Sequence, residues 1–141
     1  MLPYSDAARF WLPARHVEVH STGDDTLPAP GEKMSWPIYQ QRDFSFASEW
    51  HHYLGVFAAP ALNGFASVFD PLNRTHLIRI FPANIARGVK LFLLGDLPSD
   101  LYTDGDSRYL ELWGGYTRTF NDEATLLPGR VVTWTEYWTT R

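Results

Sequence analysis

The sequence predicts an all-β protein, an antiparallel β-sandwich built from short strands. Short runs rich in β-branched and aromatic residues recur along the chain, a composition typical of strands. Turn segments such as STGDD, LPAPGE, ALNG and LPGR separate these runs at regular spacing, and their Gly, Pro, Asn and Asp residues favour reversals of the chain. Helical periodicity is missing from the pattern. Regular alternation of strand and turn favours a sandwich over alternating strand and helix units.

The first half of the chain is predicted to contain four strands, over residues 16–20, 34–39, 53–58 and 64–69. The first two flank the turn segments STGDD and LPAPGE, and the next two flank ALNG. Each run ends where residues that favour turns begin. We therefore expect antiparallel neighbours with tight connections in this half.

The second half is predicted to contain strands over residues 76–81, 89–94, 109–116 and 131–138. DPLN precedes the first of these strands, the segment LPSDLYTDGDS separates 89–94 from 109–116, and LPGR precedes the last. Within that long segment, DGD at 104–106 is expected to form a turn, because the ordered acidic ligands of a calcium loop do not follow it.

Length, charge and composition restrict the function. At 141 residues the chain is expected to form one domain that buries about two-thirds of the surface of its unfolded form. A net charge of −4 argues against nucleic acid as a partner. The apolar runs are too short for a membrane helix, so we expect no membrane partner. Without cysteine there is no thiol chemistry, and the cellular location stays undetermined.

Histidines are the candidate metal ligands in this sequence. His51 and His52 are adjacent in WHHY, and adjacent residues of a strand point to opposite faces, so the two are not expected to hold one metal ion together. A metal site would need a partner from His16, His20 or His76. We expect neither a metal nor a cofactor.

In the mainly apolar stretch LELWGGYTRTF, Glu111 places a carboxylate between two leucines. In a strand, Tyr109, Glu111 and Trp113 share one face, while Leu110 and Leu112 face the other way. An aromatic ring can cover the apolar face of a sugar while a carboxylate and a phenol bind its hydroxyls. One face is therefore predicted to belong to the core and the other to bind sugar.

A structural role for Glu111 is the alternative. The carboxylate would pair with Arg79, Arg108 or Arg118 on a solvated sheet face, and Trp113 would be a core residue. An ionised carboxylate in an apolar strand needs such a partner. Sequence alone leaves both interpretations open.

LELWGGYTRTF followed by ATLLPGRVVTWTEYW resembles the C-terminal end of the galactose mutarotase (aldose 1-epimerase) superfamily. There a strand bearing a glutamate precedes a loop, a leucine-proline-glycine turn and a final strand. VEVHSTGDDTLPAPGEKMSWPIYQQRDFS and GFASVFDPLNRTHLIRIFP resemble upstream segments of the same superfamily, so the resemblance runs from about Phe10 to Trp138. It is closer still to an uncharacterised bacterial group of mutarotase-like proteins. The resemblance implies a mutarotase-like sandwich, part of a supersandwich, with Glu111 where the family has its general base.

The resemblance also limits the expected activity. The general-acid histidine of the family belongs to a segment that would lie before residue 1, so the chain is expected to be the C-terminal portion of a larger protein. Where the family has an acidic sugar-binding residue beside a histidine, this chain reads EWHHYLG, with Glu49, His51 and His52. Catalysis needs both an acid and a base. We therefore expect carbohydrate recognition without autonomous catalysis, with Glu111, Trp113, Tyr109, His51 and His52 as site residues.

Two other functions remain open at this point. One is an epimerase that uses Glu111 as base and His51 or His52 as acid. The other is a structural module whose exposed sheet binds another chain. Because half of a large sandwich would expose strand edges that can pair with another chain, we also expect a homo-oligomer.

Overall fold

In the computed structural model, the described residues are 2–58, 60–101 and 108–141. They form strands and two short 3₁₀ turns, η1 (Ala47–Glu49) and η2 (Ser99–Leu101). The strands are β1 (Leu2–Pro3), β2 (Arg9–Trp11), β3 (His16–Thr22), β4 (Lys33–Ser35), β5 (Ile38–Tyr39), β6 (Arg42–Asp43), β7 (Leu54–Phe57), β8 (Phe65–Asp70), β9 (Thr75–Ile80), β10 (Gly88–Leu93), β11 (Tyr109–Gly115) and β12 (Tyr137–Thr140). In this part of the chain no helix has the length and apolar character to cross a membrane.

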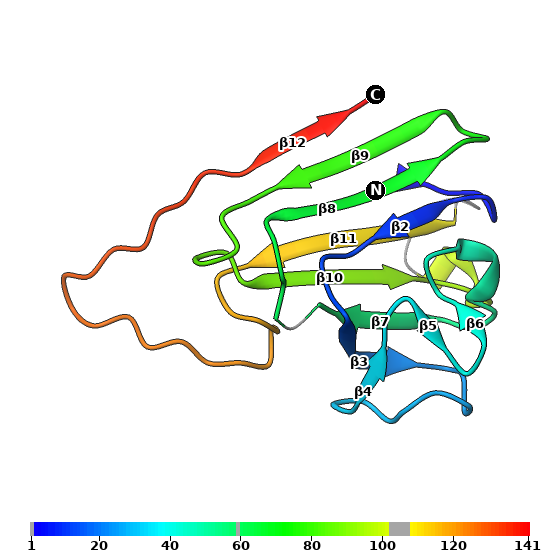
Figure 1. Ribbon diagram of the computed structural model, residues 1–141, viewed down its shortest axis with the longest axis horizontal. Helices are drawn as coiled ribbons and strands as arrows, with labels where there is room; N and C mark the ends of the chain where they lie inside the picture. Colours follow the sequence, from blue (N-terminus) through cyan, green and yellow to red (C-terminus); the bar gives the residue numbers. More distant parts are fainter. Residues whose placement is uncertain (1, 59, 102–107) are drawn as a thin grey trace.

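Two antiparallel sheets form the body of the molecule (Figure 1). The larger sheet has six strands in the order β1-β11-β10-β7-β3-β4, and the smaller has four in the order β12-β9-β8-β2. Strands β5 and β6 make a separate hairpin. The predicted all-β antiparallel sandwich is confirmed.

The core lies between the two sheets. Val56 and Leu91 come from the larger sheet, and Phe10 and Val68 come from the smaller one; all four belong to one buried apolar cluster. Their neighbours in each strand face outward, as the period of two requires. Burying each such side chain contributes about 1.5–3 kcal/mol, so the alternating runs of the sequence account for the packing of the sheets.

Two predicted strands differ from the observed ones. The predicted strand 34–39 is divided into β4 and β5 by Trp36 and Pro37, which are joined by a cis peptide bond, because Pro37 has no N–H for a ladder hydrogen bond. Of the predicted strand 131–138 only Tyr137 and Trp138 lie in a strand, β12, which ends at Thr140. The predicted turn at 104–106 lies outside the described residues.

Candidate functional site

Strand β11 presents two different faces. Leu110 is buried in the core, and Leu112 packs against it. Glu111 is half-buried and Trp113 is 37% exposed on the opposite face. Tyr109 shares that face but is buried in a second apolar cluster. The predicted division of the strand into a leucine face and a Tyr-Glu-Trp face is therefore present.

Glu111 pairs with Lys90 of the neighbouring strand β10. The Nζ atom of Lys90 lies 2.8 Å from Oε2 of Glu111, and the two side chains are 12% and 40% exposed. The partners predicted for a structural Glu111, which were Arg79, Arg108 and Arg118, are wrong. Each of these arginines pairs with a different carboxylate.

The ion pair lies in a hollow of about 420 Å³ on the outer face of the larger sheet. The rings of Tyr53, Phe92 and Tyr109 contribute apolar wall, and Lys90 and Glu111 contribute opposite charges. The complete lining is His20, Ser21, Tyr53, Lys90, Phe92, Leu97, Tyr109 and Glu111. The hollow thus combines flat apolar rings with hydrogen-bonding groups, which is the usual composition of a small-molecule site.

Gly55 of β7 lies close to this hollow. A Cβ atom on Gly55 would stand 2.9 Å from Cδ2 of His20 and 3.2 Å from the ring of Phe92. A larger residue would therefore push these rings away from their positions. The glycine allows His20 and Phe92 to approach the same point of the strand.

Phe120 extends the aromatic surface beside the hollow. It follows β11 in a loop, and its ring centroid lies 4.6 Å from that of His20, 5.0 Å from Phe57 and 6.3 Å from Trp113, in edge-to-face contacts. The Nζ atom of Lys90 lies 5.4 Å from the centroid of the same ring. Trp113 is thus connected to the hollow through Phe120 and is not among the residues that line it.

His20 is the histidine of this site. Burial is the main cause that lowers the pKa of its imidazole, the positive charge of Lys90 lowers this pKa further, and the carboxylate of Glu111 partly opposes the shift. The imidazole is therefore neutral at pH 7, with one nitrogen that donates a hydrogen bond and one that accepts.

His51 and His52 lie elsewhere. Both are exposed, because they precede β7, which begins only at Leu54. Nδ1 of His52 lies 2.7 Å from Oδ2 of Asp96, and this hydrogen bond lowers the pKa of Asp96. Neither histidine lines the hollow around Glu111.

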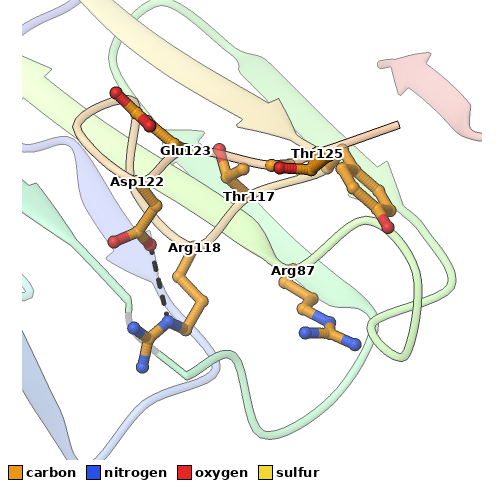
Figure 2. A pocket seen from close by; sticks show the side chains of 8 residues that line it. Arg87, Thr117, Arg118, Asp122, Glu123 and Thr125 are labelled. Atoms are coloured by element: carbon orange, nitrogen blue, oxygen red, sulfur yellow. Dashed lines mark ion pairs between the residues drawn. The ribbon is translucent and has the colours of Figure 1, made fainter. Parts of the chain in front are cut away.

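A second hollow, of about 490 Å³, lies where the loop after β11 passes the start of β10. It is lined by Arg87 and by loop residues, and Nε of Arg118 is 3.5 Å from Oδ2 of Asp122. Figure 2 shows these two side chains pointing toward one another, while Glu123 points away. Its lining comes mainly from an exposed loop and not from a sheet, so the hollow around Glu111 is the better candidate site.

Chemically, the hollow around Glu111 offers hydrogen bonds beside flat rings. Lys90 donates, Glu111 accepts, and Ser21 and His20 can do both. Within residues 2–58, 60–101 and 108–141, no group of three histidine or acidic side chains could hold a metal ion. The arrangement suits a ligand with several hydroxyl groups and an apolar face.

Comparison with known proteins gives one informative similarity. The chain resembles the crystal structure of a TPR-domain containing protein from Parabacteroides distasonis ATCC 8503, with a TM-score of 0.73 and 19% sequence identity. The alignment covers 99% of this chain and 23% of that protein, so the chain spans less than a quarter of its length. At this identity the likeness shows the fold alone. No protein-family model matches the sequence, and no curated protein matches it.

Proposed function

We propose that this domain binds neutral carbohydrate in the hollow around Glu111 and does not catalyse a reaction on its own. The observation that carries this proposal is the Lys90–Glu111 ion pair, which lies among the rings of Phe92 and Tyr109 with its carboxylate 40% exposed. A sugar needs both elements, since its hydroxyls require hydrogen bonds and its C–H face requires apolar contact.

The charges of the site favour a neutral ligand. Lys90 and Glu111 compensate one another, and His20, whose pKa is lowered, adds no charge at pH 7. An anionic ligand would face the carboxylate, and a cationic ligand would face the ammonium group. A hydroxyl can accept a hydrogen bond from Lys90 and donate one to Glu111 without separating them.

Resemblance to the mutarotase superfamily supports this proposal, because Glu111 matches the position of a residue that contacts sugar in that family. The resemblance rests on the ordered motifs of the sequence. The likeness in fold to the Parabacteroides protein is compatible with it but says nothing about ligands.

Two observations argue against autonomous epimerisation. His52, one proposed acid, is hydrogen-bonded to Asp96 and does not line the hollow, and His51 does not line it either. His20 lies in the hollow, but its lowered pKa leaves the imidazole mainly unprotonated at pH 7, so it holds little of the proton that a general acid must donate. A base without a matched acid supplies only half of the proton transfers that ring opening requires.

Calorimetric titration with glucose, galactose and mannose tests the binding proposal. We expect saturable binding near 1 mM, equivalent to about 4 kcal/mol, for at least one sugar, and loss of this binding in Lys90→Met. Glu123→Gln, which changes a carboxylate in the second hollow, is the matched control and should bind as the wild type does. Equal affinity of wild type and Lys90→Met would overturn the proposed site.

Polarimetry tests the absence of catalysis. Freshly dissolved α-glucose and α-galactose should reach equilibrium at the buffer rate in the presence of the protein. An acceleration that disappears in Glu111→Gln would establish an epimerase and contradict this part of the proposal.

A further inference from the structure

The C-terminal strand β12 pairs with β9, and a buried charged contact lies where β12 begins. Arg79 on β9 is fully buried between the sheets. Its Nε donates to Oε2 of Glu136 at 2.9 Å and its Nη2 to Oε1 at 2.5 Å, while Nη1 donates to the carbonyl oxygen of Gly88 at 3.0 Å. Glu136 immediately precedes β12. A bidentate pair of this kind fixes orientation as well as charge.

The residues around Arg79 pack closely against its guanidinium group. A Cβ atom on Gly114 would stand 1.9 Å from Cζ of Arg79, so only glycine fits there. On another side, Cζ lies 4.0 Å from the ring centroid of Phe81. In the described part of the chain, Glu136 is the carboxylate that reaches this cation. Because an unpaired buried cation is very costly, the position requires the carboxylate that β12 brings with it.

A long exposed arm, residues 123–135, leads to this contact. Figure 1 shows it leaving the body and returning to the edge of the smaller sheet. All its residues are exposed except Val132, which is intermediate. Among the described residues, its hydrogen bonds are local, from Arg130 N–H to Leu127 O and from Trp134 Nε1 to Glu136. Apart from the stacking of Trp134 on Tyr116, little holds the arm to the chain that carries it.

We propose that two copies of this chain exchange β12, so that the arm of each copy places its strand on β9 of the other and its Glu136 against the partner copy's Arg79. The chemistry of the contact is complementary in either direction, because every copy carries both the buried cation and the carboxylate. Each exchanged strand makes the same contacts as in the closed form, which makes exchange a low-cost route to a dimer.

Exposed apolar side chains of the arm favour the exchange. Leu126, Leu127 and Val131 are 56%, 61% and 79% exposed in the single chain, where they bury little. In a two-fold dimer the two arms run from one copy to the other and can pack these side chains against each other, which removes apolar surface from water. The exchange therefore adds contacts at the arms while it preserves those of β12.

Disulfide trapping tests the exchange, because the chain has no cysteine of its own. Thr139 of β12 lies opposite Ile78 of β9, so we make the single variants Ile78→Cys and Thr139→Cys, unfold and refold them together, and oxidise the mixture. Exchange predicts a mixed covalent dimer on a non-reducing gel, and light scattering of the wild type should give the mass of two chains. Only a single-chain mass and no mixed dimer would overturn the proposal.

A second mixture separates exchange from random collision. Ser48 is exposed and lies in η1, outside β12, so Ser48→Cys replaces Thr139→Cys in the control. Exchange predicts at least a tenfold smaller yield of mixed dimer with Ser48→Cys. Equal yields would contradict the exchange, even if the protein is a dimer by mass.

Discussion

Two ion pairs on opposite sides of the larger sheet make a useful comparison. Arg79 and Glu136 meet between the sheets, where their side chains are 0% and 18% exposed. Lys90 and Glu111 meet on the outer face, where the exposures are 12% and 40%. The first pair joins β9 to the residue before β12, the second joins β10 to β11, and both lie beside aromatic rings. They differ in what can reach the carboxylate.

The difference separates a structural contact from a binding contact. Every donor nitrogen of Arg79 has an acceptor within the chain, so no ligand is needed there. Glu111 accepts a hydrogen bond from Lys90 and opens into the hollow, so a ligand hydroxyl can reach it. The same chemistry thus stabilises the fold at one position and is available for recognition at the other.

Among these predictions, breaking the buried Arg79–Glu136 pair should cause the largest change in the free energy of unfolding. Glu136→Ala leaves the Arg79 cation unpaired between the sheets, and we expect a loss of about 3 kcal/mol in the free energy of unfolding, at the low end for broken buried pairs. Urea denaturation measures it. Arg79→Met/Glu136→Leu, which removes both charges, should recover most of this stability. A double variant as unstable as the single one would contradict the role given to the charge.

Acid should remove the contribution of the Arg79–Glu136 pair to the stability of the folded protein. Arg79 is the main cause that lowers the pKa of Glu136. Because the folded-state pKa is below the ordinary value of 4.5, the stabilisation is complete above about pH 4.5 and is lost as the pH falls through the folded-state pKa. Thermal unfolding between pH 6 and pH 3 should therefore show a steeper loss for wild type than for Arg79→Met/Glu136→Leu.

The outer pair should matter much less for stability. In Glu111→Gln the replaced carboxylate is 40% exposed and the glutamine keeps a hydrogen-bond acceptor for Lys90, so we expect a change below about 1 kcal/mol in the free energy of unfolding from urea denaturation. Sugar binding should nevertheless be lost. A large loss of stability would indicate that Glu111 is a structural residue, as the alternative interpretation of the sequence holds.

The smallest expected change in stability comes from the titration of His20. Its pKa is lowered in the folded protein from an ordinary value of 6.5, chiefly by burial, so the unfolded chain binds a proton more readily. The contribution of the neutral His20 side chain to the free energy of unfolding is therefore complete above pH 6.5, and it declines slightly as the pH falls below this value. His20→Gln should remove this slope between pH 7 and pH 5.5, as followed by thermal unfolding. An unchanged slope would show that another group causes it.

Much of the fold was predictable because strands and turns are local. Alternation in β3 reflects burial on one face, and the turn residues mark where each strand ends. The same alternation placed Glu111 opposite the leucine face. The arm before β12 was predicted as strand because VVTWTEYW has the composition of one, but residues 131–136 have no neighbouring strand to pair with.

The partners in the site could not be predicted, because they depend on strand order. Lys90 reaches Glu111 only because β10 and β11 are neighbours in a particular register, in which Trp113 stands opposite Lys90. Phe120 contacts His20 from a loop, and no periodicity applies to a loop. Arg79 gave the clearest missed signal, since it is a charge in the apolar run HLIRIF.

A sugar titration mapped on the amide signals of ¹⁵N-labelled protein tests whether the outer ion pair binds carbohydrate and the buried one does not. Binding in the hollow predicts concentration-dependent shifts at residues of β10, β11 and β3 around Lys90 and Glu111, with β9 and β12 unchanged. These shifts should vanish in Lys90→Met. Signals that stay unchanged with every sugar tested, or that move at β9 and β12 instead, would contradict the claim.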